Sequence, residues 1–174
     1  MNEPSRQHEG SSSSPGPIVV GVIQAQPPAV VDHAVTLARA LGTSLICAYV
    51  DPTSYTTTSR REGAERVVAI DPDAGESLAR QQGIRIRKVL AARLEDCPVE
   101  WRFQTLAGEP ARELSRLAEH TGASFIVVGT REPGLAARLE EFLSGSVALH
   151  LAHHQGRPVV VVPLHPKPFA VGNQ

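Results

Sequence analysis

The sequence Val127-Val128-Gly129-Thr130-Arg131 closes an apolar strand, and the chain then continues through Glu132-Pro133-Gly134 to a second glycine pair, Gly145-Ser146. That pair opens a segment of helical pattern that stops at Pro158. A strand followed by glycines and a helix N-terminus gathers free backbone N–H groups and positive helix dipole around one concavity, which is how α/β proteins hold phosphate. This stretch therefore predicts an α/β fold and marks the first candidate ligand site.

Outward from this stretch, apolar runs alternate with helical patterns. Residues 18–23 are continuously apolar, which is typical of a strand covered on both faces of a parallel sheet, and residues 44–50 predict a second buried strand. Residues 99–106 alternate apolar and polar side chains and predict an edge strand with one solvated face. Two further strands are expected at 125–128 and 158–163. Helices are expected at 27–42, 74–94, 110–122 and 146–154, the second with Gly83 interrupting its middle.

This alternation predicts a three-layer α/β sandwich with an open, five-stranded, mostly parallel sheet in the order 3-2-1-4-5, the winding of adenine nucleotide alpha hydrolase-like and flavodoxin-like folds. Ligands in such folds bind beyond the carboxyl ends of the strands, where the winding reverses. The expected crevice lies between the first strand, which ends at Ile23, and the fourth, which ends at Val128.

Composition limits the classes of function. The 174 residues are 41% apolar and carry a net charge of −1, which suits one domain and disfavours nucleic acid or an anionic membrane as a partner. Cys47 and Cys97 match neither a disulfide framework nor a zinc site, and packing is their expected role. We expect a cytoplasmic protein with a disordered tail at 1–16, one domain at 17–163 and a C-terminal tail at 164–174.

Residues 51–73 predict a long surface loop with a short strand at 67–70. Its segment 53–61 places several hydroxyls beside two arginines. The alternatives for this segment are a phosphorylation site, a mobile lid over the crevice, or only a flexible loop.

Four stretches of the chain resemble the universal stress protein family. They are Ile18-Val19-Val20-Gly21-Val22, Gly108-Glu109-Pro110-Ala111, Ile126-Val127-Val128-Gly129-Thr130-Arg131, and Gly145-Ser146-Val147 with His153-His154 and residues 158–163. The resemblance implies a homodimer formed by antiparallel pairing of the last strand, Val159, Val160, Val161 and Val162, with its copy. It also implies a candidate site for an adenine nucleotide, with no cofactor firmly implied and ATP as the candidate, at Val22, Ile23, Val50, Gly129, Thr130, Arg131, Gly134, Gly145, Ser146 and Val147.

Two positions depart from the ATP-holding members of that family, which carry G-x2-G-x9-G-[ST]. Glu132 occupies the second glycine position, and the loop to Gly145 is about three residues longer than the pattern. Ile23 stands where those members tend to have an Asp near the adenosine. We therefore expect a stress-response regulatory or binding module with weak or no ATP binding, no enzymatic activity and an unknown regulatory protein partner. The alternative is an ATP-binding switch or slow ATPase that uses the loop from Gly129 to Ser146.

Other candidate chemistry is less specific. His150, His153 and His154 share one helix face, and His165 follows the last strand, but interaction with the helix dipole accounts for them and no metal is expected. The sequence indicates no catalytic nucleophile with an identifiable base. A phosphoryl-receiver module fits worse, because residues 23–25 offer no carboxylate to hold Mg²⁺.

Overall fold

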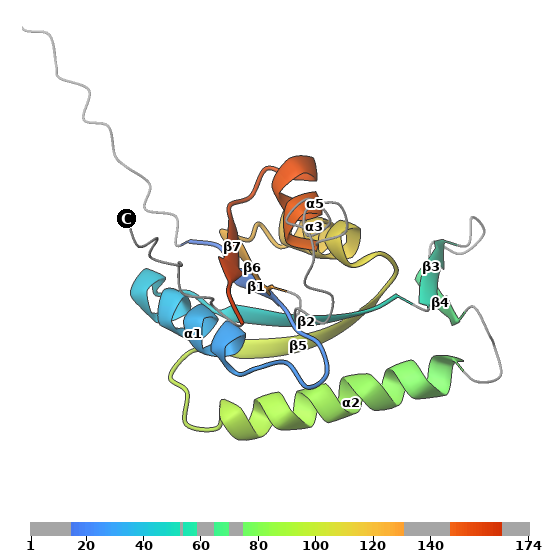
Figure 1. Cartoon of the computed structure of the whole chain (residues 1–174), viewed down its shortest axis with the longest axis horizontal. Coiled ribbons are helices and arrows are strands. Elements are labelled where there is room, and N and C mark those ends of the chain that lie inside the picture. The colour runs from blue at the N-terminus through green and yellow to red at the C-terminus, as the bar shows by residue number, and fades with distance from the viewer. Residues whose placement is uncertain (1–14, 53, 59–64, 70–74, 131–146, 165–174) are drawn as a thin grey trace, which may run out of the picture.

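The structure of the chain is a computed structural model that describes residues 15–52, 54–58, 65–69, 75–130 and 147–164 (Figure 1). The main sheet contains β1 (Ile18–Gly21), β2 (Leu45–Asp51), β5 (Trp101–Ala107), β6 (Phe125–Gly129) and β7 (Val159–Val162). Its strand order is β5-β2-β1-β6-β7, and every described pair in it is parallel. This confirms the order predicted from the sequence, 3-2-1-4-5 along the chain.

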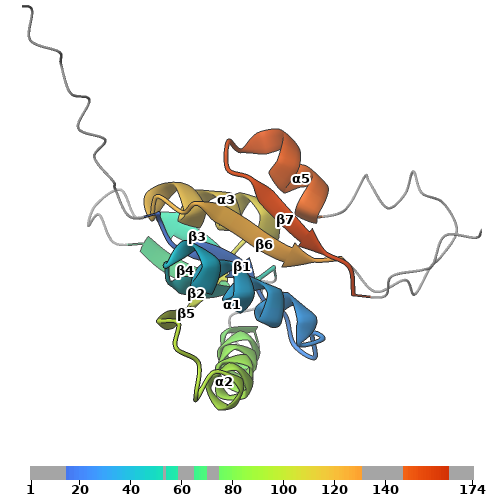
Figure 2. The same ribbon diagram turned by 90° about the vertical axis from the view of Figure 1, so that its left-hand side faces the viewer.

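Helices cover both faces of the sheet (Figure 2). On one face, α1 (Ala29–Leu41) and α2 (Gly75–Arg93) bury a core against β1 and β2 that includes Val20, Cys47 and Leu90. On the other face, α3 (Pro110–His120) and α5 (Val147–His154) bury a second core that includes Ile46, Leu117 and Ile126. The apolar runs of β1 and β2 are thus buried on both sides, as a parallel sheet requires.

The edge strand β5 has the expected alternating pattern. Trp101 and Phe103 pack against the α1–α2 core, whereas Arg102 and Gln104 are exposed. Beside β5 runs α2, which remains continuous through Gly83. A Cβ atom at Gly83 would lie 2.9 Å from the Thr105 hydroxyl oxygen, so this glycine allows close approach of helix and strand.

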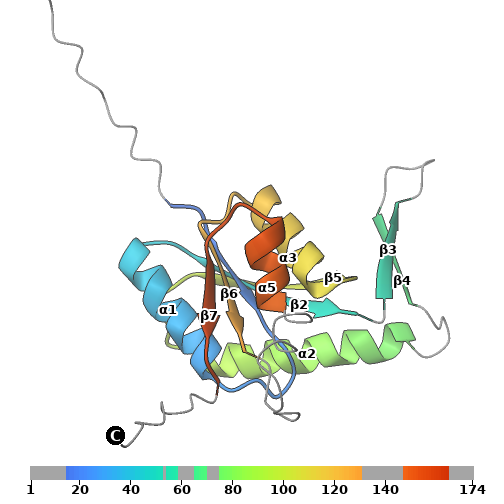
Figure 3. The same ribbon diagram turned by 45° about the horizontal axis from the view of Figure 1, so that its top comes forward.

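The segment between β2 and α2 differs from the loop that the sequence predicts. It contains two short strands, β3 (Ser54–Thr58) and β4 (Glu65–Ala69), which pair antiparallel. The short strand expected at 67–70 is present but begins earlier, because the Thr- and Tyr-rich segment offers it a partner with high β propensity. The hairpin lies beyond the N-terminal end of α2, outside the main sheet (Figure 3).

Glycines end two helices as the sequence predicts. Gly42 follows α1 with φ of 63°, and Gly122 lies two residues beyond α3 with φ of 61°. These left-handed conformations suit glycine and turn the chain sharply into the next strand. At the start of the domain, the Thr43 hydroxyl bonds to the carbonyl oxygens of Pro15 and Gly16, 3.0 and 2.9 Å away, which holds the entry to β1 against this turn.

Candidate ligand crevice at the carboxyl edge of the sheet

The loop from β1 to α1 forms the first wall of the predicted crevice. Val22 directly follows β1 and is still bonded to β2, because its N–H donates to the Ala48 carbonyl at 2.9 Å, and its side chain is buried. Ile23 leaves the sheet, and its side chain is 63% exposed. The Ile23 N–H donates to Gln26 Oε1 at 2.9 Å, so this backbone donor is already used within the loop.

Further contacts fix the shape of this loop. Ala25 has φ of 57°, a left-handed conformation that is uncommon for a residue with a Cβ atom. The Gln82 amide donates to Gln24 Oε1 at 2.8 Å and links the loop to α2. The loop is thus held by Gln26 from within and by Gln82 of α2, and it presents the apolar Ile23 to solvent together with Gln24 and Ala25.

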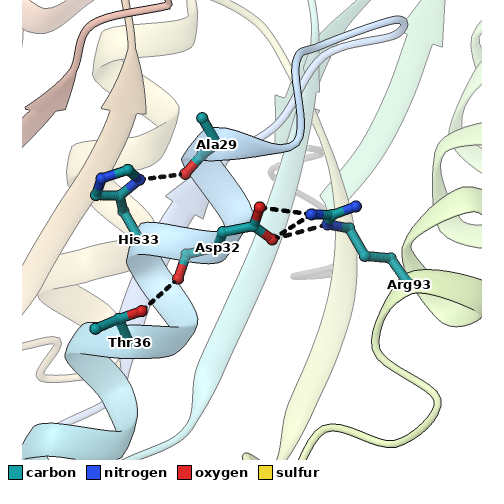
Figure 4. Close-up of polar contacts among 5 residues, drawn as sticks. All are labelled: Ala29, Asp32, His33, Thr36 and Arg93. Atoms are coloured by element: carbon teal, nitrogen blue, oxygen red, sulfur yellow. Dashed lines mark hydrogen bonds and ion pairs between the residues drawn. The ribbon is translucent and has the colours of Figure 1, made fainter.

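The start of α1 is fixed from the side of α2. Arg93, the last residue of α2, donates from Nε and Nη2 to Asp32 Oδ1 at 2.8 and 2.6 Å (Figure 4). Asp32 lies in the first turn of α1 and is the first acidic residue after β1. Its carboxylate is bound to the guanidinium, so it does not supply the acceptor that position 23 lacks.

The exit of β6 forms the opposite wall. The Thr130 N–H donates to the Val162 carbonyl at 2.9 Å, and the Thr130 hydroxyl accepts from the Leu164 N–H at 3.0 Å. A Cβ atom at Gly129 would lie 2.9 Å from Val30 Cγ2 and 3.2 Å from Leu164 Cδ1. Both residues therefore have a packing role, because they join β6 to the first turn of α1 and to the end of β7.

The remaining predicted ligand residues divide into two groups. Val50 is buried and Val147 is half-buried in the core beneath α3 and α5, whereas Val22 belongs to the core on the other face of the sheet. The second group, which consists of Arg131, Gly134, Gly145 and Ser146, lies outside the described residues, as does Glu132. The structure thus brings the ends of β1 and β6 together but makes Val22 and Val50 core residues of opposite faces.

Two acidic residues at this edge were not among the predicted site residues. Asp51 ends β2 with only 4% of its surface exposed, and its carbonyl accepts from the Gly108 N–H at 3.0 Å. Burial raises the pKa of the nearby Tyr49 hydroxyl, and the negative charge of Asp51 acts in the same direction. The sequence signal for Asp51 is an acidic residue that directly follows a buried apolar run.

The second of these acids is Glu109, which caps α3. Its carboxylate accepts from the N–H groups of Ala111 and Arg112 at 3.0 and 2.7 Å. Gly108 precedes it with φ of 130°. The carboxylate therefore occupies the helix N-terminus where an anion would otherwise bind.

Other candidate centres do not gain support from the geometry. Within the described ranges, no group of three or more His, Cys, Asp or Glu residues could hold a metal ion, and His165 lies outside those ranges. Burial raises the pKa of the Cys47 thiol to about 12, which keeps it protonated. Among the residues that the structure describes, no helix is both long enough and apolar enough to cross a membrane.

An open depression of about 780 Å³ lies at the opposite end of the strands. It is lined by residues at the amino ends of β1, β2 and β5 and at the end of α3, among them Glu100, Arg102 and His120. It shares no residue with the predicted crevice. Because ligands of doubly wound folds bind at the carboxyl edge, we place the candidate site there and not in this depression.

The other predicted functional surface is β7. It is the edge strand beside β6, with Val161 44% exposed and Val162 buried. Val159 and Val160 are half-buried. An apolar strand at the edge of a sheet offers unpaired backbone groups for pairing with a second chain.

Comparison with known proteins agrees with this fold. The profile of the Universal stress protein family matches residues 16–163. A universal stress protein solved in complex with cAMP aligns with a TM-score of 0.63 and 21% identity, covering 88% of this chain and 100% of that one. UspA from Lactobacillus plantarum aligns with a TM-score of 0.63 and 19% identity, covering 86% of this chain and 99% of that one. The universal stress protein from Archaeoglobus fulgidus in complex with dAMP aligns with a TM-score of 0.57 and 18% identity, covering 86% of this chain and 99% of that one. No curated protein sequence matches at a significant level.

Proposed function

The chain belongs to the universal stress protein family, and from that premise we propose that it is a homodimeric regulatory or binding module of the stress response that holds ATP weakly or not at all. Similar proteins have been solved with cAMP, dAMP and AMP. An adenine nucleotide is therefore the ligand against which the crevice of this chain has to be judged.

One observation carries the proposal of weak binding. At the end of β1, the exposed Ile23 side chain offers no hydrogen-bond acceptor to a ribose, and its N–H is bonded to Gln26. Desolvating nucleotide hydroxyl groups against an aliphatic side chain leaves them without partners, which costs about 1–3 kcal/mol for each buried group. The Thr130 N–H is likewise bonded to Val162 and does not serve phosphate.

The proposal assigns no catalytic activity to the chain. Of its two thiols, Cys47 is buried with its pKa raised to about 12, and Cys97 is half-buried in the turn after α2. A nucleophilic cysteine needs a depressed pKa and access to substrate, and Cys47 has neither. The function would then be exerted through binding and through contacts with other proteins.

A second candidate, the ATP-binding switch or slow ATPase, also has support. The start of α1 has Pro28 at its N-cap with no side-chain cap, which leaves the helix dipole available to an anion at this edge. Within the described residues, the Thr130 hydroxyl accepts one hydrogen bond and donates none, so its own hydrogen can serve an anion there. This candidate would use the loop from Gly129 to Ser146 as its phosphate cradle.

The experiment that separates the two candidates is a denaturing extraction of the purified protein, analysed for nucleotide by mass spectrometry, together with calorimetric titration with ATP and AMP. We expect an empty extract and a dissociation constant weaker than about 1 mM, the level of about −4 kcal/mol in binding free energy. An Ile23→Asp variant restores a charged acceptor and should tighten binding about tenfold or more. Ile23→Ser is the matched control, because it removes the aliphatic group without adding charge.

Each outcome has a distinct meaning. Stoichiometric ATP in the wild-type extract would establish the switch candidate and remove the proposal of weak binding. If wild type and Ile23→Asp bind nucleotide equally, residue 23 does not determine the affinity, and the argument from the β1–α1 loop is wrong.

A further inference from the structure

The outer face of α2 combines exposed aliphatic side chains with cations. Ile84 and Val89 are 61% and 68% exposed, whereas Ile86 and Leu90 on the inner face are 6% and 5% exposed. Arg85 and Lys88 are exposed beside them. Residues four apart are neighbours on a helix, so Ile84 lies next to Lys88 and Arg85 lies next to Val89.

From Leu78 to its end, α2 carries charge of one sign. Every charged residue between Leu78 and Leu94 is basic, although the whole chain has a net charge of −1. These residues are Arg80, Arg85, Arg87, Lys88 and Arg93. Acidic residues occur only at the limits, with Glu76 near the start of α2 and Glu95 and Asp96 after its end.

Only part of this positive charge is neutralised within the described residues. Asp32 on α1 pairs with Arg93, and Arg80 also has an interaction. Over the same residues, Arg85, Arg87 and Lys88 form no ion pair with an acidic side chain of the chain itself. The outer face of α2 therefore presents unneutralised cations directly beside aliphatic surface.

We propose that the outer face of α2, formed by Ile84, Arg85, Lys88 and Val89, docks an acidic amphipathic helix of a partner protein. Such a helix carries carboxylates beside aliphatic side chains at the same four-residue spacing, so both kinds of group find their complement. The face is available in a dimer that pairs through β7, because α2 lies near β5 and β2, away from the β7 edge of the sheet (Figures 1 and 2).

The same observations disfavour two other anionic partners. A membrane-bound helix inserts a continuous apolar face. The apolar face of α2 is already used against the sheet, and Ile84 and Val89 are about 140° apart around the helix. Nucleic acid would neutralise the cations but would leave both aliphatic side chains without apolar partners.

The test uses the full-length protein and a fluorescein-labelled probe peptide of about 20 residues, long enough to form a helix, built from Glu and Leu at helical spacing. A scrambled peptide of the same composition is the probe control. We expect wild type to bind the amphipathic probe at least about tenfold more tightly than the scrambled one. Binding should weaken about tenfold between about 0.05 and 0.5 M salt, because exposed charges are screened.

Variants localise the binding. Arg85→Glu/Lys88→Glu should weaken probe binding about tenfold or more, because attraction becomes repulsion. Ile84→Ser/Val89→Ser should weaken it by about fivefold or more through the loss of apolar contact. The matched control is Arg112→Glu/Arg157→Glu, which makes the same change in net charge at exposed positions on α3 and in the connection between α5 and β7 and should bind as wild type.

Several results would overturn the proposal. No saturable binding below about 1 mM, equal binding of the scrambled peptide, or equal weakening by the control variant would each do so. Tighter binding to a duplex DNA of about 20 base pairs would replace the protein partner with nucleic acid. Tighter binding to phosphatidylserine vesicles would replace it with a membrane surface. Circular dichroism and urea unfolding of each variant exclude loss of fold as the cause.

Discussion

Replacing Gly129 by alanine tests whether the glycine at the end of β6 is required for packing. A Cβ atom there would lie 2.9 Å from Val30 Cγ2 and 3.2 Å from Leu164 Cδ1, whereas carbon atoms pack best at about 3.5–4.0 Å. Val30 is fully buried in α1, and a β-branched side chain in a helix has one strongly preferred rotamer, so it cannot turn away.

The expected loss of stability follows from two opposing effects. Overpacking of a close-packed site costs about 1–3 kcal/mol. Because Gly129 has no positive φ, alanine fits its backbone, and the reduced entropy of the unfolded chain returns about 0.4–1 kcal/mol. We therefore expect Gly129→Ala to lower the free energy of unfolding by about 1–2 kcal/mol, which corresponds to about 2–8 °C in Tm for a chain of this size.

The assay is urea unfolding followed by the fluorescence of Trp101, the single tryptophan of the chain. Gly156→Ala is the matched control, because a Cβ atom there meets no heavy atom within 4 Å, and it should leave stability unchanged or slightly raised. A double-mutant cycle of Gly129→Ala with Val30→Ala should give a coupling energy of at least about 0.5 kcal/mol, since the alanine at position 30 removes the clashing methyl group. Equal stabilities of Gly129→Ala and Gly156→Ala would refute the packing role.

Two further predictions concern the sheet edge and the thiols. Val161→Lys places a charge on the exposed face of β7 and should convert a wild-type dimer into a monomer in sedimentation velocity. The control variant Val89→Lys on α2 should stay dimeric. A monomeric wild type would rule out pairing through β7. In native protein at about pH 8, a thiol reagent should modify Cys97 and leave Cys47 unmodified until the chain unfolds, because a pKa of about 12 leaves on the order of one thiolate in ten thousand; equal reaction of both would contradict the burial of Cys47.

The parts of the fold that the sequence predicts are those whose patterns are local. A strand covered on both faces must be apolar throughout, so 18–23 and 44–50 are recognisable without knowledge of their neighbours. The alternation at 99–106 likewise reflects a single solvated face. Glycines after α1 and α3 mark left-handed turns that few other residues adopt, and both have the expected positive φ.

The features that the sequence does not predict depend on partners that are distant along the chain. Gly83 resembles a helix breaker until its contact with Thr105 of β5 is known. Strand β3 requires β4 for its hydrogen bonds, and the sequence of neither segment predicts the pairing by itself. The ion pair between Asp32 and Arg93 joins residues 61 positions apart, so no local spacing rule finds it.

The candidate site likewise has a part that local sequence predicts and a part that depends on contacts between distant residues. Gly129 and Thr130 are recognisable from the sequence as a motif, but the motif has two physical explanations that the sequence leaves open. One is a phosphate cradle, and the other is the joining of β6 to α1 and β7. The contacts to Val30, Val162 and Leu164 supply the second explanation for both residues within the described part of the chain.

A consequence is that the glycine motif is weak support for a bound nucleotide in this chain. Selection for a stable sheet would keep Gly129 and Thr130 even if the ligand were lost, because Gly129 packs closely against Val30 and Thr130 is hydrogen-bonded to Val162 and Leu164. Position 23 has no such second constraint, since its side chain is 63% exposed and contributes little to the core. The amino acid at position 23 can therefore be determined by ligand binding alone. Gly129→Ala and Ile23→Asp should accordingly separate the two requirements, the first acting on stability and the second on affinity. A variant pair in which both changes act on nucleotide affinity alone would show that this division between packing and binding is wrong.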